Sequence, residues 1–173
     1  AAGRKAGCEA PFKRPARLAT DRASICDVLF HALDALKEPY DYVVLLQATS
    51  PLRTAADIDA CIRLCHRARA PAAVSVSPAP KPPQWLYWLD ARQRLRRIVK
   101  ERLAADRRQD LPPAYALNGA VYVARPKWLR TTRDFVGAGT RAYVMPPERS
   151  VDIDTSLDLL IARALVAERR HRG

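Results

Sequence analysis

The sequence is 173 residues long, with 49% hydrophobic and 28% charged residues, and this composition suits one globular domain that buries a sizeable core. It contains no apolar run of about 18 residues and no charged-then-apolar leader, so we expect a cytoplasmic protein rather than a membrane or secreted one. The formal net charge is +12, but the basic residues are scattered rather than confined to one stripe, which argues against a nucleic-acid-binding protein.

The first half of the chain predicts alternating helices and strands. Apolar residues recur at helical spacing from about Ala23 to Lys37, and the β-favouring run Tyr42 to Leu46 follows. Thr54 and Asp57 have the spacing of a capping box, which predicts the start of a second helix. The apolar run Ala72 to Ser77 then predicts another buried strand. This order favours an α/β fold with a mostly parallel sheet and helices on both faces.

The segment after Ser77 is expected to leave the sheet. Pro78 to Trp85 is rich in proline, which fixes φ and removes hydrogen-bond donors. The aromatic run WLYWL, Trp85 to Leu89, and the basic stretch behind it predict a projecting arm over residues 80–112. The aromatic side chains suit an interface with a second copy of the chain, and they equally suit a cover over the core of the same subunit.

The last third predicts two short strands and a helix. AVYVA, Ala120 to Ala124, is typical of a buried strand, and VDID, Val151 to Asp154, predicts a second one. Thr155 and Asp158 repeat the capping-box spacing ahead of the final helix. The closing residues RRHRG predict a frayed, solvated tail.

The four cysteines do not indicate a zinc site. Cys61 and Cys65 have a helical spacing of four residues, while Cys8 and Cys26 have no close partner, so paired CxxC motifs are absent from the sequence. Because cysteine often serves as a small buried apolar residue, we expect reduced thiols packed under the sheet.

Polar side chains follow the strand at Tyr42 to Leu46. In the loop LLQATSPLR, Leu45 to Arg53, an amide, two hydroxyls and a guanidinium stand at the carboxyl end of a strand, where open α/β sheets bind ligands. Arginine binds carboxylate or phosphate in a bidentate way, although Arg53 could equally hold the loop in place. Ser50 and Thr49 beside Pro51 are also common turn formers.

Two carboxylates close to the C-terminus form a possible metal site. On a strand, Asp152 and Asp154 would point to the same face, and such a pair can hold one Mg²⁺ ion that completes its octahedron with water and substrate phosphates. Alternatively, Asp154 only starts the final helix and Asp152 is solvated.

Four segments in this order resemble the cytidylyltransferases that activate acidic nonulosonic sugars, including CMP-sialic acid synthetases. They are RPARLATDRAS (Arg14 to Ser24), LLQATSPLR, ALNGAVYVARP (Ala116 to Pro126) and SVDIDTSLDL (Ser150 to Leu159). Ala48 stands where this family usually has proline. The resemblance implies a Rossmann-like sheet of the nucleotide-diphospho-sugar transferase type, an arm that reaches a second subunit to form a homodimer, and transfer of CMP from CTP to the sugar with release of pyrophosphate.

The resemblance also implies three groups of site residues. It implies that the catalytic and Mg²⁺-binding residues are Asp152 and Asp154, that the sugar-binding residues are Gln47, Thr49, Ser50, Arg53, Arg108, Asn118 and Tyr122, and that the nucleotide-binding residues are Arg14 and Ser24. On the residues alone, Asn118 could be a turn residue, Tyr122 a core aromatic and Arg108 a surface charge that Arg107 could replace. Asp21 matches the same stretch, but its only role could be to cap the next helix.

One element of the resembled family has no counterpart in the sequence. The family has a glycine-rich basic loop, RxxSxRxxxKN, that cradles the CTP triphosphate, whereas Ala1 to Gly7 lacks that spacing. We therefore expect residues 1–173 to be an N-terminally truncated piece of one cytidylyltransferase-like domain, with doubtful activity alone. A noncatalytic module that binds sugar or dimerises, and a basic nucleic-acid binder, are the alternatives.

Overall fold

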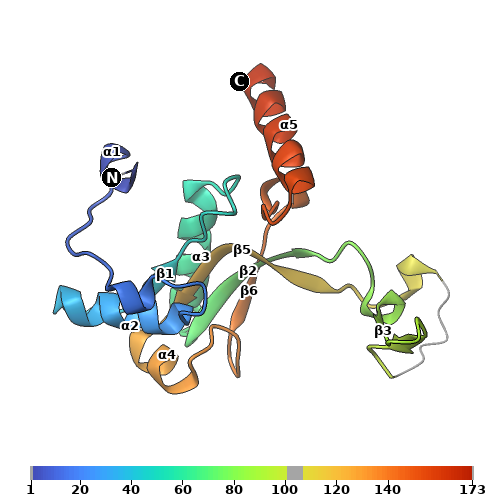
Figure 1. Cartoon of the computed structure of the whole chain (residues 1–173), viewed down its shortest axis with the longest axis horizontal. Coiled ribbons are helices and arrows are strands. Elements are labelled where there is room, and N and C mark those ends of the chain that lie inside the picture. Colours follow the sequence, from blue (N-terminus) through green and yellow to red (C-terminus); the bar gives the residue numbers. More distant parts are fainter. Residues whose placement is uncertain (1, 101–106, 173) are drawn as a thin grey trace.

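The computed structural model describes residues 2–100 and 107–172 (Figure 1). The strands are β1 (Val43–Leu45), β2 (Ala72–Pro78), β3 (Tyr87–Leu89), β4 (Leu95–Arg97), β5 (Tyr115–Ala124) and β6 (Arg141–Val144). The helices are α1 (Ala2–Lys5), α2 (Ile25–Leu36), α3 (Ala55–Arg67), α4 (Pro126–Thr132) and α5 (Ser156–Arg172). None of the helices in these two stretches is both long and apolar enough to cross a bilayer.

The main sheet has four strands in the order β1-β5-β2-β6. β6 runs parallel to β2, while β5 runs antiparallel to both β1 and β2. β1, β2 and β6 therefore share one direction, and β5 is the reversed strand between them. The predicted α/β fold with mostly parallel strands is confirmed in this sense.

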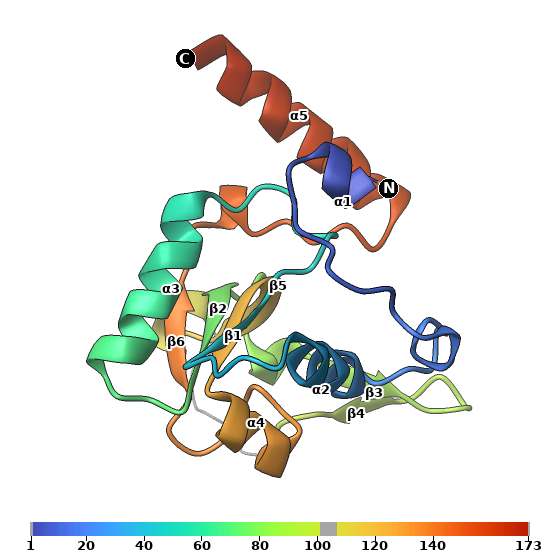
Figure 2. The same ribbon diagram turned by 90° about the vertical axis from the view of Figure 1, so that its left-hand side faces the viewer.

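Helices cover both faces of the sheet, as predicted (Figure 2). On one face, α3 contributes Cys61 to a core cluster that also contains Ala73 of β2 and Val121 of β5. On the other face, α2 and α4 contribute Cys26 and Leu129 to a second cluster with neighbouring residues of the same strands. Because the central strands are covered on both faces, the buried parts of β2 and β5 are largely apolar rather than alternating.

β5 is longer than the sequence predicted. It has 10 residues, whereas only Ala120 to Ala124 was expected. Its first half extends along β2, where Leu117 lies opposite Val76 and Tyr115 opposite Pro78. The sequence analysis did not predict β6, whose residues are mostly exposed and lack an apolar run, or α4, whose seven residues are too few for a periodic pattern.

Both predicted capping boxes are present. The hydroxyl of Thr54 accepts from the N–H of Asp57 (3.2 Å), and the Asp57 carboxylate accepts from the N–H of Thr54 (2.9 Å). Thr155 and Asp158 make the equivalent pair of hydrogen bonds, at 3.3 and 2.8 Å. The sequence therefore located the starts of α3 and α5 correctly.

Two predictions for the C-terminal region are wrong. Val151 to Asp154 is not a strand, because the Ile153 N–H donates to the Thr49 carbonyl (2.9 Å) in the loop after β1 rather than to a neighbouring strand. The expected frayed tail is helical as far as Arg172, and Arg169 donates to the carbonyl of Leu52 (3.2 Å). Both contacts tie the C-terminal region to the loop after β1.

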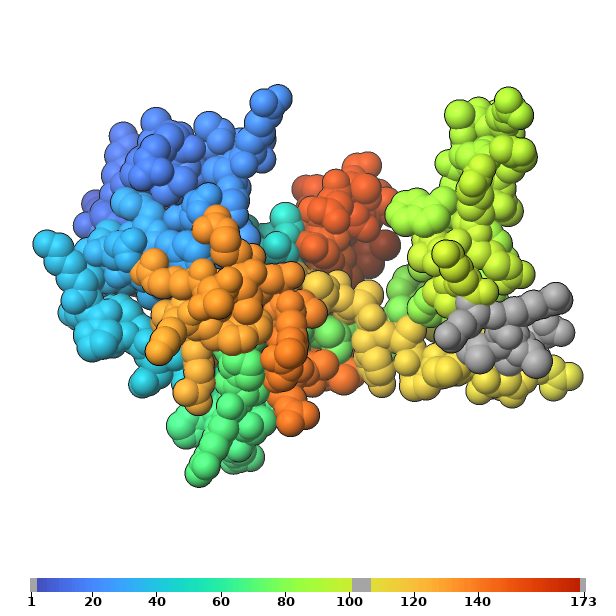
Figure 3. All heavy atoms as spheres, turned by 90° about the horizontal axis from the view of Figure 1, so that it is seen from below, coloured from blue at the N-terminus to red at the C-terminus, as the bar shows by residue number. Residues whose placement is uncertain are grey.

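The predicted arm contains a two-stranded hairpin, β3 with β4, that stands away from the main sheet (Figures 1 and 3). Asp90 accepts hydrogen bonds from the backbone N–H groups of Arg92 (2.9 Å) and Arg94 (3.0 Å) at its turn. Trp88 is 65% exposed and Leu89 66% exposed, so these side chains do not cover the core of the same subunit. Residues 101–106 of the predicted arm lie outside the described residues.

The prediction of buried thiols is correct for three of the four cysteines. Cys26, Cys61 and Cys65 are buried and form no disulfide. Burial, with a smaller contribution from Cys65, raises the pKa of Cys61 to about 12, so this thiol stays protonated. Cys8 is exposed and contradicts the prediction, because it lies in the N-terminal segment outside both core clusters.

Candidate active site

The loop between β1 and α3 is folded by its own arginine. The Arg53 guanidinium donates through Nη1 to the carbonyl oxygens of Gln47 (2.6 Å) and Ser50 (2.8 Å). Burial lowers the pKa of Arg53 from its ordinary value, but an arginine remains a cation in this setting. Arg53 thus performs the second of its two predicted roles, holding the loop in place, and its contact with a sugar stays a prediction.

Three predicted site residues converge on Gly119 of β5. Gly119 has φ +70°, and a Cβ built there would meet Gln47 Oε1, Asp152 Oδ2 (2.9 Å) and Ser50 Oγ (3.0 Å). The strand can carry only glycine at this point, because the backbone conformation disfavours other residues and the three polar atoms occupy the space of a side chain. An amide, a hydroxyl and a carboxylate from segments far apart in the sequence are thereby brought together.

Ser50 connects these segments. Its side chain is completely buried, and its one hydroxyl hydrogen is shared between two acceptors, the Asn118 carbonyl (3.2 Å) and Asp152 Oδ1 (3.4 Å). Gln47 is half-buried and Thr49 is exposed, while the Thr49 carbonyl receives the Ile153 N–H. The loop after β1 and the Asp152 segment therefore form one wall.

Asn118 holds β5 in place beneath this wall. Its Oδ1 accepts from the Ser75 hydroxyl (2.6 Å) and the Ala120 N–H (3.2 Å), and its Nδ2 donates to the Ser150 hydroxyl (3.0 Å). The side chain is only 3% exposed, so both of its polar atoms are engaged with the protein. The predicted sugar contact of Asn118 stays a prediction, while the structure gives it a connecting role.

Ser75 and Ser150 were missed as supporting residues of the site. Ser75 is buried at the bulge where the pairing of β2 with β5 shifts register, and its hydroxyl accepts from the Val121 N–H (2.8 Å). The two serines inside the apolar run AAVSVS could have pointed to this role, because a hydroxyl buried in a core strand needs a polar partner.

The two predicted metal-binding aspartates differ in their surroundings. Asp152 is half-buried beside Ser50, whereas Asp154 is exposed at the start of α5, where its N–H donates to Asp158 Oδ2 (3.2 Å). Burial and, to a smaller degree, the negative charge of Asp152 raise the pKa of Tyr122. Tyr122 thus lies within electrostatic range of Asp152, and its ring packs against Phe135.

An ion pair between buried Asp57 and partly exposed Arg149 stabilises the site from the α3 side. Asp57 is 1% exposed, and its carboxylate accepts from Arg149 Nε (3.0 Å) and Nη2 (2.9 Å) and from the Tyr143 hydroxyl (3.1 Å). Arg149 directly precedes the segment that carries Asp152. The sequence analysis identified Asp57 only as a capping residue, because the capping box accounts for its spacing without a second partner.

The remaining predicted residues are not brought into this group. Arg108 lies at the base of the arm, where its guanidinium donates to the Ala79 carbonyl (3.3 Å) and lines a groove of about 500 Å³. Arg14 is exposed in the N-terminal segment. Ser24 is the N-cap residue of α2 in place of Asp21, but its hydroxyl makes no capping hydrogen bond.

The two carboxylates of Asp152 and Asp154 suit a magnesium ion. They are too few for a metal ion whose ligands all come from protein side chains. Residues 2–100 and 107–172 contain no group of three or more His, Cys, Asp or Glu side chains that could hold a metal ion. Magnesium commonly binds through one or two carboxylates and takes its other ligands from water and phosphates. Asp152 is half-buried and Asp154 exposed, so a bound group could reach both carboxylates.

Comparison with known proteins finds similarity to several cytidylyltransferases and CMP-sugar synthases. The chain is 30% identical over 170 residues to a CMP-N,N'-diacetyllegionaminic acid synthase of Legionella pneumophila, a match covering 92% of this chain and 70% of the relative. It is 30% identical over 166 residues to a pseudaminic acid cytidylyltransferase of Campylobacter jejuni, covering 93% and 70%. It is 33% identical over 150 residues to an N-acylneuraminate cytidylyltransferase of Escherichia coli, covering 86% and 35%. No protein-family model matches the sequence.

Among solved structures, the chain is similar to a CMP:2-keto-3-deoxy-manno-octonic acid synthetase that was determined in complex with CTP. The TM-score is 0.57, the sequence identity is 16%, and the match covers 86% of this chain and 70% of the other. At this level of identity the similarity shows a shared fold, in agreement with the four-stranded core and its helices.

Proposed function

The chain belongs to the family of CMP-nonulosonate cytidylyltransferases, and we propose from this membership that it transfers CMP from CTP to an acidic nonulosonic sugar. In this reaction the anomeric oxygen of the sugar bonds to the α-phosphorus of CTP, and the bond between the α- and β-phosphates breaks. Pyrophosphate leaves, and the hydroxyl proton passes to a base. Positioning and charge stabilisation dominate such phosphoryl chemistry.

The convergence of Gln47, Ser50 and Asp152 on Gly119 is the observation that supports the proposal most strongly. The Gln47 amide both donates and accepts, so it can orient a polyhydroxy sugar, and the Thr49 hydroxyl lies exposed in the same loop. The Ser50 hydroxyl holds one oxygen of the Asp152 carboxylate, Oδ1, at 3.4 Å, while the other oxygen, Oδ2, lies against Gly119. A carboxylate held in this way can accept a hydrogen bond from a bound hydroxyl group.

We assign Asp152 and Asp154 as the residues that would hold Mg²⁺. When bound, this ion supplies positive charge that neutralises the charge developing at the α-phosphate. The surroundings of Asp152 keep its carboxylate oriented, because Ser50 fixes one oxygen and the backbone bond from Ile153 to Thr49 fixes the segment. Asp154 follows on the same segment, exposed and able to turn toward a phosphate-bound ion.

Other predicted contacts extend the proposed site. Ser24 leaves its hydroxyl unused in capping α2, so it is available to a nucleotide, and exposed Arg14 precedes it on the same segment. Arg108 lines the groove at the base of the arm, and its guanidinium could bind the sugar carboxylate there. The charge of Asp152 acts on the hydroxyl of Tyr122, and we propose that Tyr122 contacts the sugar ring.

We further propose that the chain forms a homodimer through the hairpin of β3 and β4. Trp88, Leu89 and Leu95 are each about two-thirds exposed, and exposed aromatic side chains among arginines are typical of protein interfaces. The free cysteines suit a reducing compartment, which favours the cytoplasm as the place where the enzyme acts.

A pyrophosphate-release assay with CTP, Mg²⁺ and a panel of neuraminic, legionaminic and pseudaminic acids tests the proposed reaction. It should use this chain and, in parallel, this chain extended by the corresponding upstream residues of the Legionella pneumophila relative. Release of pyrophosphate that depends on one of the sugars is the expected result for at least the extended protein. If neither protein releases pyrophosphate while both bind the sugar, the noncatalytic module is the better account.

A further inference from the structure

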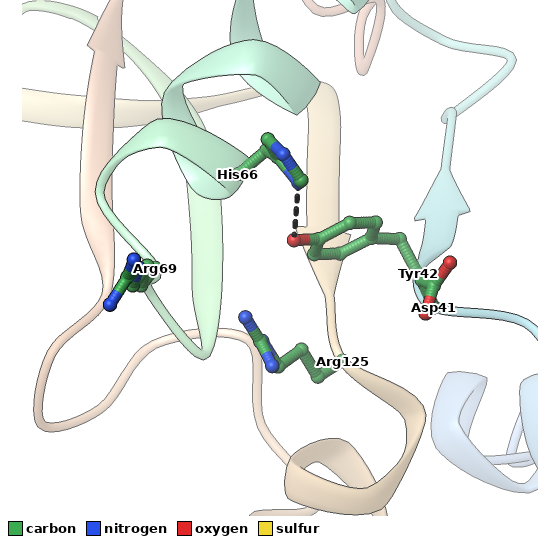
Figure 4. A pocket seen from close by; sticks show the side chains of 5 residues that line it. All are labelled: Asp41, Tyr42, His66, Arg69 and Arg125. Atoms are coloured by element: carbon green, nitrogen blue, oxygen red, sulfur yellow. Dashed lines mark hydrogen bonds between the residues drawn. The ribbon is translucent and has the colours of Figure 1, made fainter.

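A second pocket lies at the end of the strands opposite to the candidate active site. It has a volume of about 460 Å³ and is lined by Asp41, Tyr42, His66, Arg69 and Arg125 (Figure 4). Tyr42 directly precedes β1 and Arg125 directly follows β5, whereas the loop of the candidate active site begins where β1 ends. The two sites are therefore separated by the length of β1.

The Arg125 side chain is held in position at this pocket. Its backbone N–H donates to the Pro71 carbonyl (2.9 Å), its Nε donates to the Ala70 carbonyl (3.3 Å), and its guanidinium carbon lies 5.8 Å from the centroid of the Tyr42 ring. The Tyr42 ring thus covers one face of the guanidinium, and the Ala70 carbonyl accepts from one of its three nitrogens. The terminal nitrogens point toward the space between His66 and Arg69 in Figure 4.

Arg69 supplies a second cation from an unusual backbone position. It follows the end of α3 with φ +49°, a left-handed conformation that favours glycine at the end of a helix and is strained for other residues. Its N–H donates to the His66 carbonyl (3.0 Å), which fixes the turn. Within residues 2–100 and 107–172, neither Arg69 nor Arg125 forms an ion pair with a carboxylate.

The other lining residues add polar atoms. The Tyr42 hydroxyl lies 3.4 Å from His66 Nδ1, and the two rings meet edge to face at 6.4 Å between centroids. Asp41 is the single acid of the lining, and Figure 4 shows it on the far side of Tyr42 from Arg69. The cavity is therefore lined by two guanidinium groups that have no carboxylate partner within the described residues, and by one carboxylate on the other side of Tyr42.

We propose that this pocket binds a phosphate-bearing small molecule. A phosphate dianion matches the charge of two guanidinium groups, whereas a monocarboxylate matches only one, and the fork of arginine donors suits phosphate oxygens. The cavity volume is in the range of small-molecule sites. The competing explanation for Arg69 is attraction of its charge to the C-terminal end of α3, which needs no ligand.

Nuclear magnetic resonance of the side chains of the full chain tests this proposal. Inorganic phosphate is titrated into the protein while the ring signals of His66 and the guanidinium signals of Arg125 are followed, with acetate as a second probe. We expect saturable shifts with phosphate and binding of acetate that is at least about tenfold weaker, the equivalent of one charge-assisted contact. Absence of shifts at His66 and Arg125 with phosphate would overturn the proposal.

Two substitutions and one control assign the binding to these residues. Arg69→Gly removes the cation and relieves the backbone, so it should remain folded, and Arg125→Gln removes the other cation; each should weaken phosphate binding by about tenfold. Arg92→Gln removes an equal charge from the hairpin turn and should change binding less than about twofold. Equal weakening in all three variants, or undiminished binding in Arg69→Gly, would contradict the proposed site.

Discussion

The Asp57–Arg149 ion pair gives a quantitative prediction for the substitution Asp57→Asn. The asparagine keeps the shape of the side chain but loses the negative charge that faces Arg149 and Tyr143. Because Asp57 is 1% exposed, solvent cannot replace the lost partner. The variant should therefore be less stable, and the segment that leads from Arg149 to Asp152 should be less well held.

The magnitude follows from the pKa of the carboxyl. Burial alone raises the pKa of Asp57, but hydrogen bonds from Arg149, from Thr54 and from Tyr143 outweigh burial and lower it to about 2 from an ordinary 3.8. At about 1.4 kcal/mol per pKa unit, the ionised form contributes about 2 kcal/mol to the free energy of unfolding at neutral pH. A lowered pKa means that this contribution is complete above pH 4 and is lost as the pH falls toward 2.

Urea unfolding followed by circular dichroism measures this difference, and Asp59→Asn is the matched control. Asp59 lies on the same helix and pairs with Arg63 on the surface, with both side chains more than half exposed, so its loss should change stability by less than about 0.5 kcal/mol. Asp57→Asn should lose about 2 kcal/mol at pH 7 and less at pH 3. Equal stability of the two variants at pH 7 would refute the reasoning.

Three further outcomes are expected. Gly119→Ala should lower cytidylyltransfer by about 100-fold, because its Cβ would displace the polar atoms around it, while Gly7→Ala, also at positive φ but in open space, should leave the rate unchanged; similar rates would contradict the assignment. Ser75→Ala should lower the free energy of unfolding by about 1–3 kcal/mol, measured by urea unfolding, because the Val121 N–H loses the Ser75 acceptor and Asn118 Oδ1 loses one of its two donors; an unchanged stability would count against it. Trp88→Ala together with Leu95→Ala should convert a dimer into a monomer in sedimentation velocity without changing the circular dichroism spectrum, and a dimer that persists would exclude the hairpin as its interface.

The sequence predicted the fold where local physics decides the structure. Apolar periodicity identified α2, and the capping-box spacing identified the starts of α3 and α5. The central strand β2 was recognised because both of its faces are buried. The sequence analysis did not predict β6 or the reversed direction of β5, because pairing partners and direction depend on contacts between distant segments.

The sequence motifs identified residues of the candidate site, but not the contacts between distant segments that bring them together. The motif residues Gln47, Ser50 and Asp152 meet at Gly119, while their roles in binding and catalysis stay predictions. The strand predicted around Asp152 is wrong, because its backbone pairs with the loop after β1 instead of joining a ladder. The bracing role of Asp57 was not visible, since Arg149 is 92 residues away in the sequence.

The Asp152 carboxylate is proposed to serve nucleotidyl transfer, and one measurement tests this role most directly. Sugar-dependent pyrophosphate release from CTP should be compared between Asp152→Asn and Asp59→Asn, in the upstream-extended protein. We predict that Asp152→Asn lowers the rate by at least about 100-fold while Asp59→Asn retains it, with both variants folded. An active Asp152→Asn protein would contradict the account.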